Sequence, residues 1–346
     1  MEVLGYAAQS AKAPLAPYRF QRRDPRPDDV VIDILYCGIC HSDVRKVNDD
    51  WGTTHFPVVP GHEIVGRVTS LGSNAHGFRE GELVGVGCIV DSCRVCPECR
   101  TGREMFCENG VTFSFDSLEQ DGKTWTHGGY STRIVVDQRY VLRVPKQLDP
   151  ARAAPLLCAG ITTYSPLHQF GCNPGNQVAV VGLGGLGHMA VKLATSMGAD
   201  VTVLSTSPGK EEDAARLGAR RFVATKQPGA LDALAGKFDL MLDTVSAPHD
   251  LNKQLALLRN FGTLILVGLP PTPIEPFALL HGNKRIAGSN IGGIPETQEM
   301  LDYSGEHGVT ADIELIKIQD INEAYERMLR NDVKYRFVVD MTSLKA

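Results

Sequence analysis

The sequence predicts a protein of two parts, a β-rich first part and a second part in which helices alternate with the strands of a parallel sheet. The chain has 346 residues, more than one hydrophobic core usually serves, and its apolar fraction of 43% is enough for two cores. Short apolar runs broken by Gly and Pro fill residues 25–90, whereas strand-like and helix-like runs alternate after Pro174. The expected class is therefore α/β plus β.

The first part is expected to be a barrel or sandwich of short strands. Apolar runs at 30–36, 63–71 and 83–90 predict strands, and turn-forming residues separate them. Residues 91–108 interrupt this pattern with a lobe that has little apolar content of its own. Such a lobe has little reason to hold a shape without a metal ion.

The second part is expected to be a doubly wound sheet of the dinucleotide-binding type. Strands are predicted at 177–181, 201–204, 222–224, 240–245 and 263–267, with helices at 188–197, 210–217 and 251–258. The alternation ends near Gly288, and a helix at 321–330 and a strand at 337–340 follow. We expect domains at 1–150 and 151–290, with residues 291–346 returning to the first domain.

Composition excludes several classes of function. The net charge of −5, without a basic run, argues against a nucleic-acid partner. The segment Met1–Tyr6 lacks the features of a signal peptide, and no apolar stretch approaches the length that spans a bilayer, so we expect a cytoplasmic protein without membrane contact. The odd count of nine cysteines favours reduced thiols and metal ligation over disulfides.

Two groups of residues predict zinc sites. Four cysteines have the spacing C-x2-C-x2-C-x7-C, which lets four thiolates surround one structural zinc ion without a long loop: Cys93, Cys96, Cys99 and Cys107. Cys40, His62 and Cys158 offer two sulfurs and one imidazole, the open shell in which a catalytic zinc keeps a position for water or substrate. We therefore expect two zinc ions per chain with different tasks.

A glycine motif predicts the dinucleotide site. Gly182, Gly184 and Gly187, with Gly185 and Leu186 between them, follow a buried strand and open a helix, which is the context that binds a pyrophosphate. The next strand ends in hydroxyl side chains, with a cation just beyond, instead of the carboxylate that selects NAD: Ser205, Thr206, Ser207 and Lys210. The sequence favours NADP(H); alternatively, these residues form a simple turn and a solvated helix start.

These motifs together resemble the zinc-dependent medium-chain alcohol dehydrogenases, and most closely their cinnamyl alcohol dehydrogenase branch with its bacterial broad-range aldehyde reductases. The matching segments, in order, are Cys40–Asp43, Gly61–Glu63, the four-cysteine lobe, Cys158–Tyr164 and Gly182–Gly187. The resemblance implies a GroES-like β-barrel catalytic domain with a structural-zinc lobe, a Rossmann cofactor domain and a homodimer joined by sheet edges.

The resemblance also implies roles at the catalytic zinc. Cys40, His62 and Cys158 are the expected ligands, Glu63 is a carboxylate able to visit the metal, and Asp43 accepts a hydrogen bond from the ligand imidazole. Ser42 exchanges the substrate's hydroxyl proton. The other cysteines and several histidines match no such position and are expected to be ordinary residues: Cys37, Cys88, Cys172, His127, His168, His249 and His281.

Further positions are carried over for the cofactor and the substrate. The expected cofactor contacts are His41 and Arg336 at the pyrophosphate and Thr162, Val267, Ser289 and Ile291 at the nicotinamide. Trp51 and Phe113 are expected to line the substrate pocket, although a core tryptophan would give the same pattern. Arg45 stands where the family often has a proton-relay histidine, and arginine does not release its proton at neutral pH. Protons then leave through water, alcohol oxidation is slow, or Arg45 is a surface or phosphate contact.

The sequence thus predicts an NADP-dependent zinc alcohol dehydrogenase that works mainly as an aldehyde reductase, transferring hydride from NADPH to an aromatic or medium-chain aliphatic aldehyde held at the zinc. Two alternatives remain at this point. One is a polyol or secondary-alcohol dehydrogenase of the same superfamily, and the other is a catalytically silent, nucleotide-binding zinc protein. A zinc ribbon that binds nucleic acid is disfavoured, because the charges of the cysteine lobe are balanced.

Overall fold

The computed structural model describes residues 1–344, and the chain divides into two compact units. Unit 1 comprises Met1–Cys158 and the C-terminal segment from Gly292, and unit 2 comprises Ala159–Ile291. Residues 151–158, expected at the start of the second domain, lie in unit 1. The short helix Pro150–Ala153 and the turn Ala154–Leu157 in this stretch contact strands of the unit 1 sheet.

Unit 1 is built on a seven-stranded sheet with the order β16-β17-β3-β4-β5-β9, in which β8 also pairs with β3. Its strands are β3 (Asp29–Gly38), β4 (Ile64–Leu71), β5 (Leu83–Val86), β8 (Arg133–Asp137), β9 (Leu142–Arg143), β16 (Ile313–Lys317) and β17 (Arg336–Asp340). Two pairs lie outside it, β1 (Glu2–Ala7) with β2 (Ala16–Gln21) and β6 (Ile89–Asp91) with β7 (Thr112–Phe113). The helices are α1 (His41–Asn48), α2 (Pro97–Arg100), α3 (Pro150–Ala153), α9 (Ile294–His307) and α10 (Ile321–Leu329).

The strand predicted at 83–90 is in fact two strands. The chain leaves its partner β4 after Val86, and β6 then pairs with β7, so the ladder is interrupted at Gly87 and Cys88. A side chain at Gly87 would begin 3.1 Å from the carbonyl oxygen of Leu157, and this close approach of another segment fills the interruption. The apolar pattern continues across this point because both strands face a core.

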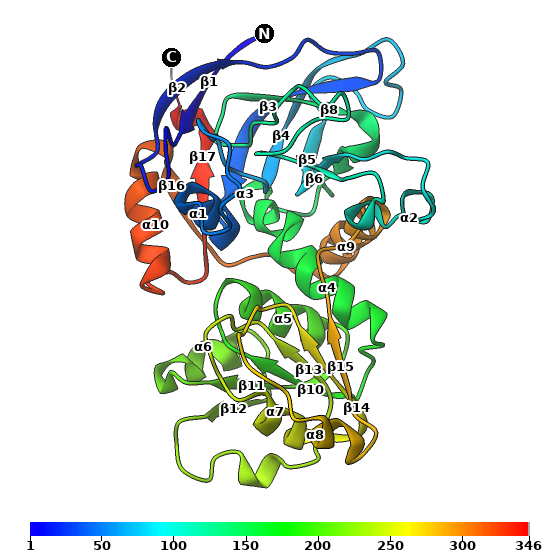
Figure 1. Cartoon of the computed structure of the whole chain (residues 1–346), viewed down its shortest axis with the longest axis vertical. Coiled ribbons are helices and arrows are strands. Elements are labelled where there is room, and N and C mark those ends of the chain that lie inside the picture. The colour runs from blue at the N-terminus through cyan, green and yellow to red at the C-terminus, as the bar shows by residue number, and fades with distance from the viewer. Residues whose placement is uncertain (345–346) are drawn as a thin grey trace. The chain divides into compact units, whose positions relative to one another are not determined.

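Unit 2 is a parallel six-stranded sheet flanked by helices (Figure 1, green to orange). The strand order is β12-β11-β10-β13-β14-β15, and every neighbouring pair is parallel. The strands are β10 (Gln177–Val181), β11 (Asp200–Ser205), β12 (Arg221–Ala224), β13 (Phe238–Asp243), β14 (Leu258–Leu266) and β15 (Arg285–Gly288). The helices are α4 (Ala159–Gln169), α5 (Gly185–Ser196), α6 (Glu211–Arg216), α7 (Leu251–Leu257) and α8 (Pro276–Leu280).

This order is that of a Rossmann fold, in which β10 and β13 are neighbours although β11 and β12 lie between them in sequence. The core beneath β13 and β14 is apolar and includes Met241, Leu255 and Leu264. All predicted strands and helices of this unit are present, with ends shifted by a few residues. Among the described residues, no helix is both long and apolar enough to cross a membrane.

Candidate metal and cofactor sites

The three residues predicted to bind a catalytic metal converge in unit 1. Cys40 immediately precedes α1, His62 lies just before β4, and Cys158 follows the turn Ala154–Leu157. The sulfurs of Cys40 and Cys158 are 3.9 Å apart. One ligand atom from each of Cys40, His62, Glu63 and Cys158 lies within 4.8 Å of every other. The fold therefore assembles two sulfurs, an imidazole and a carboxylate at one point.

Asp43 orients this group from a fully buried position on α1. Its Oδ1 atom accepts hydrogen bonds from the Gly61 amide at 3.1 Å and from Nδ1 of His62 at 3.0 Å. Its Oδ2 atom accepts from the Cys40 amide at 2.8 Å and from the Tyr130 hydroxyl at 3.1 Å. With the proton on Nδ1, His62 presents the lone pair of Nε2 for a metal. The contact predicted between Asp43 and His62 is present, and the role of Tyr130 was missed.

Glu63 is fully buried, and its Oε1 atom accepts a hydrogen bond from the Arg336 guanidinium. Its Oε2 atom has no hydrogen-bond partner among residues 1–344. Burial raises the pKa of Glu63 to about 7, although the charge of Arg336 acts in the opposite direction. The sequence suggested a pyrophosphate contact for Arg336. In the structure its guanidinium is buried and pairs with Glu63 within unit 1, and the pyrophosphate contact stays a prediction.

The charges of this group favour a cation. The hydrogen bond from Cys158 holds the pKa of Cys40 well below that of an ordinary thiol, so Cys40 carries negative charge. The same contact, seen from the other side, raises the pKa of Cys158. The buried acidic side chains of Asp43 and Glu63 lie in the same group, and the guanidinium of Arg336 is paired with Glu63. A zinc ion fits the donor set and would supply the partner that Glu63 Oε2 lacks.

An aromatic ring that the sequence analysis missed lies beside the ligand imidazole. The Phe115 ring is buried and stacks on His62, with ring centroids 5.9 Å apart and planes inclined by 25°. The two aromatic residues predicted for the pocket are more open: Phe113 is 42% exposed and Trp51 is 45% exposed. The Lys46 ammonium lies 5.7 Å from the Trp51 ring centroid. Only packing, and no pattern in the sequence, distinguishes Phe115 from Phe113.

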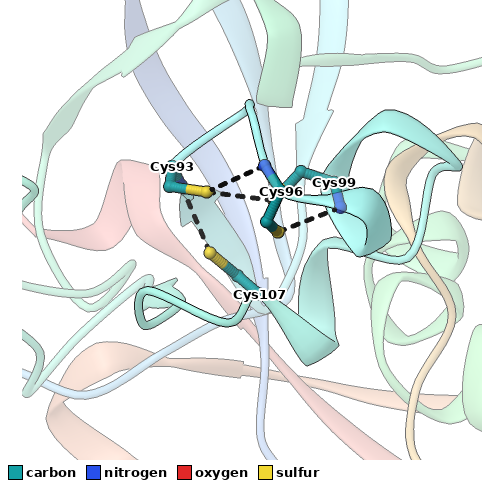
Figure 2. A group of neighbouring side chains, drawn as sticks. All are labelled: Cys93, Cys96, Cys99 and Cys107. Carbon is teal, nitrogen blue, oxygen red and sulfur yellow. Dashed lines mark hydrogen bonds between the residues drawn. The ribbon is translucent and has the colours of Figure 1, made fainter.

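The four-cysteine lobe forms the second ligand group, and Figure 2 shows its four side chains gathered around α2. The lobe supplies its own hydrogen bonds to the sulfurs: the amides of Cys93, Cys96 and Cys99 donate to the sulfurs of Cys107, Cys93 and Cys96 respectively, at 3.3–3.5 Å. Cys96 is the N-cap of α2, and Pro97 occupies the first helical position. Such amide donors stabilise thiolates, the form that binds zinc.

Thiolates this close need a cation between them. Amide donors, that of Val95 first, lower the pKa of Cys93 to about 6. Desolvation, followed by the neighbouring sulfurs of Cys96 and Cys107, raises the pKa of Cys99 to about 12. Without a cation the cluster therefore does not carry its full negative charge, and a divalent ion removes the repulsion.

The glycine loop of unit 2 has the conformation expected for a phosphate site. Gly182 has a φ of +87°, which other residues rarely adopt. A Cβ atom on Gly187 would lie 2.1 Å from the Gly182 carbonyl oxygen, so the helix starts tightly against the turn. A Cβ on Gly184 would have no heavy atom within 4 Å, which leaves open space at the N-terminus of α5. This space and the free amides of Gly185 and Leu186 suit a pyrophosphate.

The hydroxyl residues after β11 do not all have the same role. Ser205 is buried, and its hydroxyl accepts a hydrogen bond from the Ser207 amide at 3.2 Å, which forms a turn. Thr206 and Ser207 are exposed. The Lys210 ammonium donates to the Leu183 carbonyl at 2.7 Å, so this cation is fixed beside the glycine loop. The turn interpretation therefore describes Ser205, whereas the side chains of Thr206 and Ser207 are exposed and the Lys210 ammonium is held by the Leu183 carbonyl.

The remaining predicted residues lie at strand ends and helices. Thr162 is in α4, Val267 follows β14, Ser289 follows β15 and Ile291 ends unit 2, whereas His41 and Arg45 lie on α1 of unit 1. Of the residues expected to be ordinary, Cys37 and Cys172 are buried free thiols. The Cys88 sulfur lies 3.9 Å from the carbonyl oxygen of Leu157, next to the ligand Cys158. The His249 imidazole contacts the buried carboxylate of Asp243.

Fold and ligand groups define a class, and comparison with known families identifies it. Residues 26–146 match the alcohol dehydrogenase GroES-like domain, and residues 185–305 match the zinc-binding dehydrogenase family. The chain belongs to the zinc-binding alcohol dehydrogenases, which confirms the predicted family and the GroES-like and Rossmann fold.

Individual relatives match over nearly the whole chain. An "NADP-dependent alcohol dehydrogenase C 1" of Mycolicibacterium smegmatis is 54% identical over 99% of both chains, and an "Aldehyde reductase YahK" of Escherichia coli is 52% identical over 99% of both. A solved structure of cinnamyl alcohol dehydrogenase from Sorghum bicolor superimposes with a TM-score of 0.96 at 45% identity, covering 100% of this chain and 99% of that one.

Proposed function

We propose that the protein is an NADP-dependent zinc alcohol dehydrogenase that acts mainly as a reductase of aromatic or medium-chain aliphatic aldehydes. The observation that carries this proposal is the convergence of Cys40, His62, Cys158 and Glu63 within 4.8 Å. A silent zinc protein would have no use for an incomplete thiolate and imidazole set beside the complete four-cysteine lobe. The relatives named as NADP-dependent alcohol dehydrogenases and as an aldehyde reductase support the same activity.

Cys40, His62 and Cys158 would hold a zinc ion, which would supply a Lewis acid to polarise the substrate carbonyl. The remaining chemistry belongs to side chains of the chain itself. Asp43 keeps the proton of His62 on Nδ1. Arg336 pairs with the buried Glu63, whose second oxygen has no hydrogen-bond partner among the described residues. Ser42, whose hydroxyl is 3.8 Å from the Cys40 sulfur, delivers the proton to the product alcohol.

The proton that Ser42 delivers must be replaced from water. Arg45, three residues further along α1, is not a proton acceptor at neutral pH. We expect protons to reach Ser42 through water, and alcohol oxidation to be slower than aldehyde reduction. Arg45→His tests this: an unchanged alcohol oxidation rate near pH 7 would remove the relay from the rate-limiting steps.

The preference for NADP(H) rests on the residues after β11. The strand ends in hydroxyl side chains and not in a carboxylate, so a 2′-phosphate meets no repulsion from Ser205, Thr206 or Ser207. Lys210 contributes a fixed positive charge, held by the Leu183 carbonyl. A solved cinnamyl alcohol dehydrogenase of Helicobacter pylori in complex with NADP(H), with a TM-score of 0.92 and 41% identity, is consistent with this preference. The cofactor is expected to contact His41, Thr162, Val267, Ser289 and Ile291 as well.

One panel of assays tests metal, cofactor and substrate together. Benzaldehyde, cinnamaldehyde and a medium-chain aliphatic aldehyde are reduced with NADPH or NADH, before and after chelation of zinc. We expect reduction with NADPH to dominate and to be lost on chelation. Equal turnover with NADH at low concentration contradicts the cofactor preference. Activity that survives the loss of both zinc ions contradicts the mechanism.

A polyol dehydrogenase is the second candidate, because a "Probable mannitol dehydrogenase" of Medicago sativa is 50% identical over 99% of this chain. The aromatic surroundings of the metal group favour an aldehyde with apolar area to bury: Phe115 stacks on His62, and Trp51 and Phe113 are the predicted pocket walls. Mannitol and sorbitol oxidation, added to the panel, decides between the two. Faster oxidation of mannitol than reduction of benzaldehyde would favour the polyol enzyme.

We also propose a cytoplasmic homodimer. The described chain holds only free cysteines, consistent with a reducing compartment. Strand β15 is an edge of the unit 2 sheet, and unit 2 exposes four large apolar side chains: Phe261, Leu269, Phe277 and Leu280. Exposed apolar area beside a sheet edge suits a second copy of the chain. Light scattering of the wild type and of Leu280→Glu tests it: a dimer that becomes a monomer is expected, and a monomeric wild type contradicts the proposal.

A further inference from the structure

A buried carboxylate lies at the point of the unit 2 sheet where dinucleotides bind. Asp243 is the last residue of β13, is fully buried, and pairs in register with Val181, the last residue of β10. These two strands are neighbours across the point where the strand order reverses, and ligands of such sheets bind outside the carboxyl ends of the strands there. The surroundings of Asp243 therefore matter for the cofactor.

His249 contacts Asp243 through one ring nitrogen and a carbonyl of its own loop through the other. Nε2 of His249 is 2.6 Å from Oδ2 of Asp243, and Nδ1 is 2.8 Å from the carbonyl oxygen of Ala247. Donation from Nε2 to a carboxylate oxygen is a charge-assisted hydrogen bond, which is stronger than one between neutral groups. Oδ1 of Asp243 accepts from the Val245 amide at 2.9 Å.

These bonds fix residues 243–249 as a closed loop, and the start of this loop touches the glycine turn. A Cβ atom on Gly182 would lie 2.6 Å from Cγ2 of Val245 and 3.0 Å from Oγ1 of Thr244, so both side chains sit directly on that turn. The Thr244 hydroxyl donates to the Val181 carbonyl at 2.8 Å. The position of the glycine turn thus depends on the position of residues 244 and 245.

The same loop touches the segment that follows β14. The amides of Val267 and Gly268 donate to the Asp243 carbonyl at 3.0 and 2.9 Å. A Cβ on Gly268 would lie 2.4 Å from the Val245 carbonyl oxygen. Val267 is a predicted nicotinamide contact, and Gly182 belongs to the predicted pyrophosphate site. Asp243 and its loop therefore connect the two halves of the dinucleotide site inside unit 2.

We propose that His249 is a positioning residue for the dinucleotide, acting through its hydrogen bond with Asp243. The pair holds Thr244 and Val245 against the glycine turn and thereby sets the distance between the pyrophosphate and nicotinamide subsites. This inference rests on the proposed cofactor binding, and it assigns a function to a histidine that the sequence left without one. His249 does not touch the reacting atoms, so its loss affects cofactor binding and spares the metal group of unit 1.

The test measures NADPH binding by fluorescence titration, together with kcat, both KM values and zinc content. His249→Ala is expected to weaken NADPH binding about tenfold, because a buried charge-assisted hydrogen bond is lost. The kcat at saturating NADPH, the KM for the aldehyde and the zinc content are expected to change by less than about twofold. His249→Gln, whose amide can still donate to Asp243, is expected to recover part of the affinity. His281→Ala, an exposed histidine of the same unit, is the control and is expected to have no effect.

A double-mutant cycle with Asp243→Asn separates positioning from general damage. If the pair acts as a unit, His249→Ala costs little further affinity in the Asp243→Asn protein. The inference is overturned if His249→Ala binds NADPH like the wild type, if its cost is the same in both backgrounds, or if zinc content and kcat fall with the affinity. If the wild type prefers NADH, the proposed 2′-phosphate site fails, and the same variants titrated with NADH still test the pair.

Discussion

The two metal-ligand groups of unit 1 are built in different ways. The lobe takes four sulfurs from residues 93–107, and the hydrogen bonds to these sulfurs come from its own residues, among them the amides of three of the cysteines. The catalytic group takes its ligands from residues 40 to 158 and is oriented by residues that are not ligands, namely Asp43 and Arg336. The ligands of the lobe come from one short segment, whereas those of the catalytic group come from distant segments that the folding of unit 1 brings together.

Because of this difference, the metal is expected to stabilise the fold of the lobe and to serve the reaction at the catalytic group. The lobe has few apolar residues to fold around, and the metal is its main source of folding free energy. The catalytic group is held by buried hydrogen bonds that exist without the metal, such as the four donors to Asp43. Loss of the metal should therefore unfold the lobe. At the catalytic group it should abolish activity and leave the local fold intact.

The largest effect is expected at the catalytic group. His62→Ala removes a ligand and should lower aldehyde reduction by at least about a thousandfold, since metal polarisation of the carbonyl accounts for several kcal/mol. Zinc content should fall from two ions to one per chain, with little change in the melting temperature. Steady-state kinetics and elemental analysis measure these outcomes. A variant that keeps a tenth of the activity would exclude His62 as a ligand.

The lobe should respond in the opposite way. Cys96→Ser breaks the N-cap ligand of α2, and we expect a loss of about 4 kcal/mol in stability together with rapid proteolysis within residues 91–108. The protein that remains folded should retain its catalytic zinc. Cys172→Ser, at a buried thiol outside both ligand groups, is the matched control and should resist proteolysis. Equal cleavage in both variants would mean that zinc does not hold the lobe.

The buried ion pair comes next. Arg336→Met leaves the Glu63 carboxylate buried without its cation, which we expect to cost about 3 kcal/mol of folding stability in the metal-free protein. Zinc should restore part of the loss, because it supplies the missing positive charge. Adding Glu63→Gln should also relieve it. Denaturant titrations of the single and double variants, with and without zinc, measure the coupling, and strictly additive losses would show that the two side chains act independently.

Sequence spacing predicted what is local. The lobe ligands, the glycine loop and most strands follow from short patterns, because neighbours in sequence are neighbours in space there. The partner of Glu63 could not be predicted, because Arg336 is 273 residues away in the chain. Tyr130 joins Asp43 across 87 residues for the same reason. The contact of Arg336, which begins β17, depends on the pairing of β17 and β3, which no sequence pattern specifies.

Two other failures have different physical causes. Helix α4 was missed because it is buried on nearly all sides and contains Pro166, so its sequence has no amphipathic period. The contact of His249 with Asp243 was not predicted, because a histidine six residues after a strand-ending aspartate gives no sign that the loop returns to the aspartate. The role of a single polar residue depends on the groups that surround it in the folded protein, and a short sequence pattern does not specify these groups.

A smaller effect is expected from Tyr130, which supports the catalytic group through Asp43. Tyr130→Phe removes one of the four donors to that carboxylate and should weaken zinc binding at the catalytic group about tenfold, without changing the lobe. Competition with a chromophoric chelator reads the two zinc ions separately. Equal weakening of both would indicate a general loss of stability.

The smallest effect is expected at His127, which belongs to neither ligand group. Its titration contributes to the pH dependence of folding stability, and this contribution must be known before that of the ligand groups can be measured. Burial, followed by the charge of Arg22, lowers the pKa of His127 to about 4, below the value of about 6.5 in an unfolded chain. The unfolded state therefore binds a proton that the folded state does not, and stability is lost as the pH falls from about 6.5 toward 4. Allowing for partial exposure, we expect folding stability to fall by about 1 kcal/mol between pH 7 and pH 5.

The variant His127→Phe keeps a ring packed against Phe20 and should lose this part of the pH dependence of stability, measured by urea titrations at the two pH values. An unchanged slope would assign the acid sensitivity of unit 1 to the metal ligands instead, since these must also be deprotonated to hold their ions.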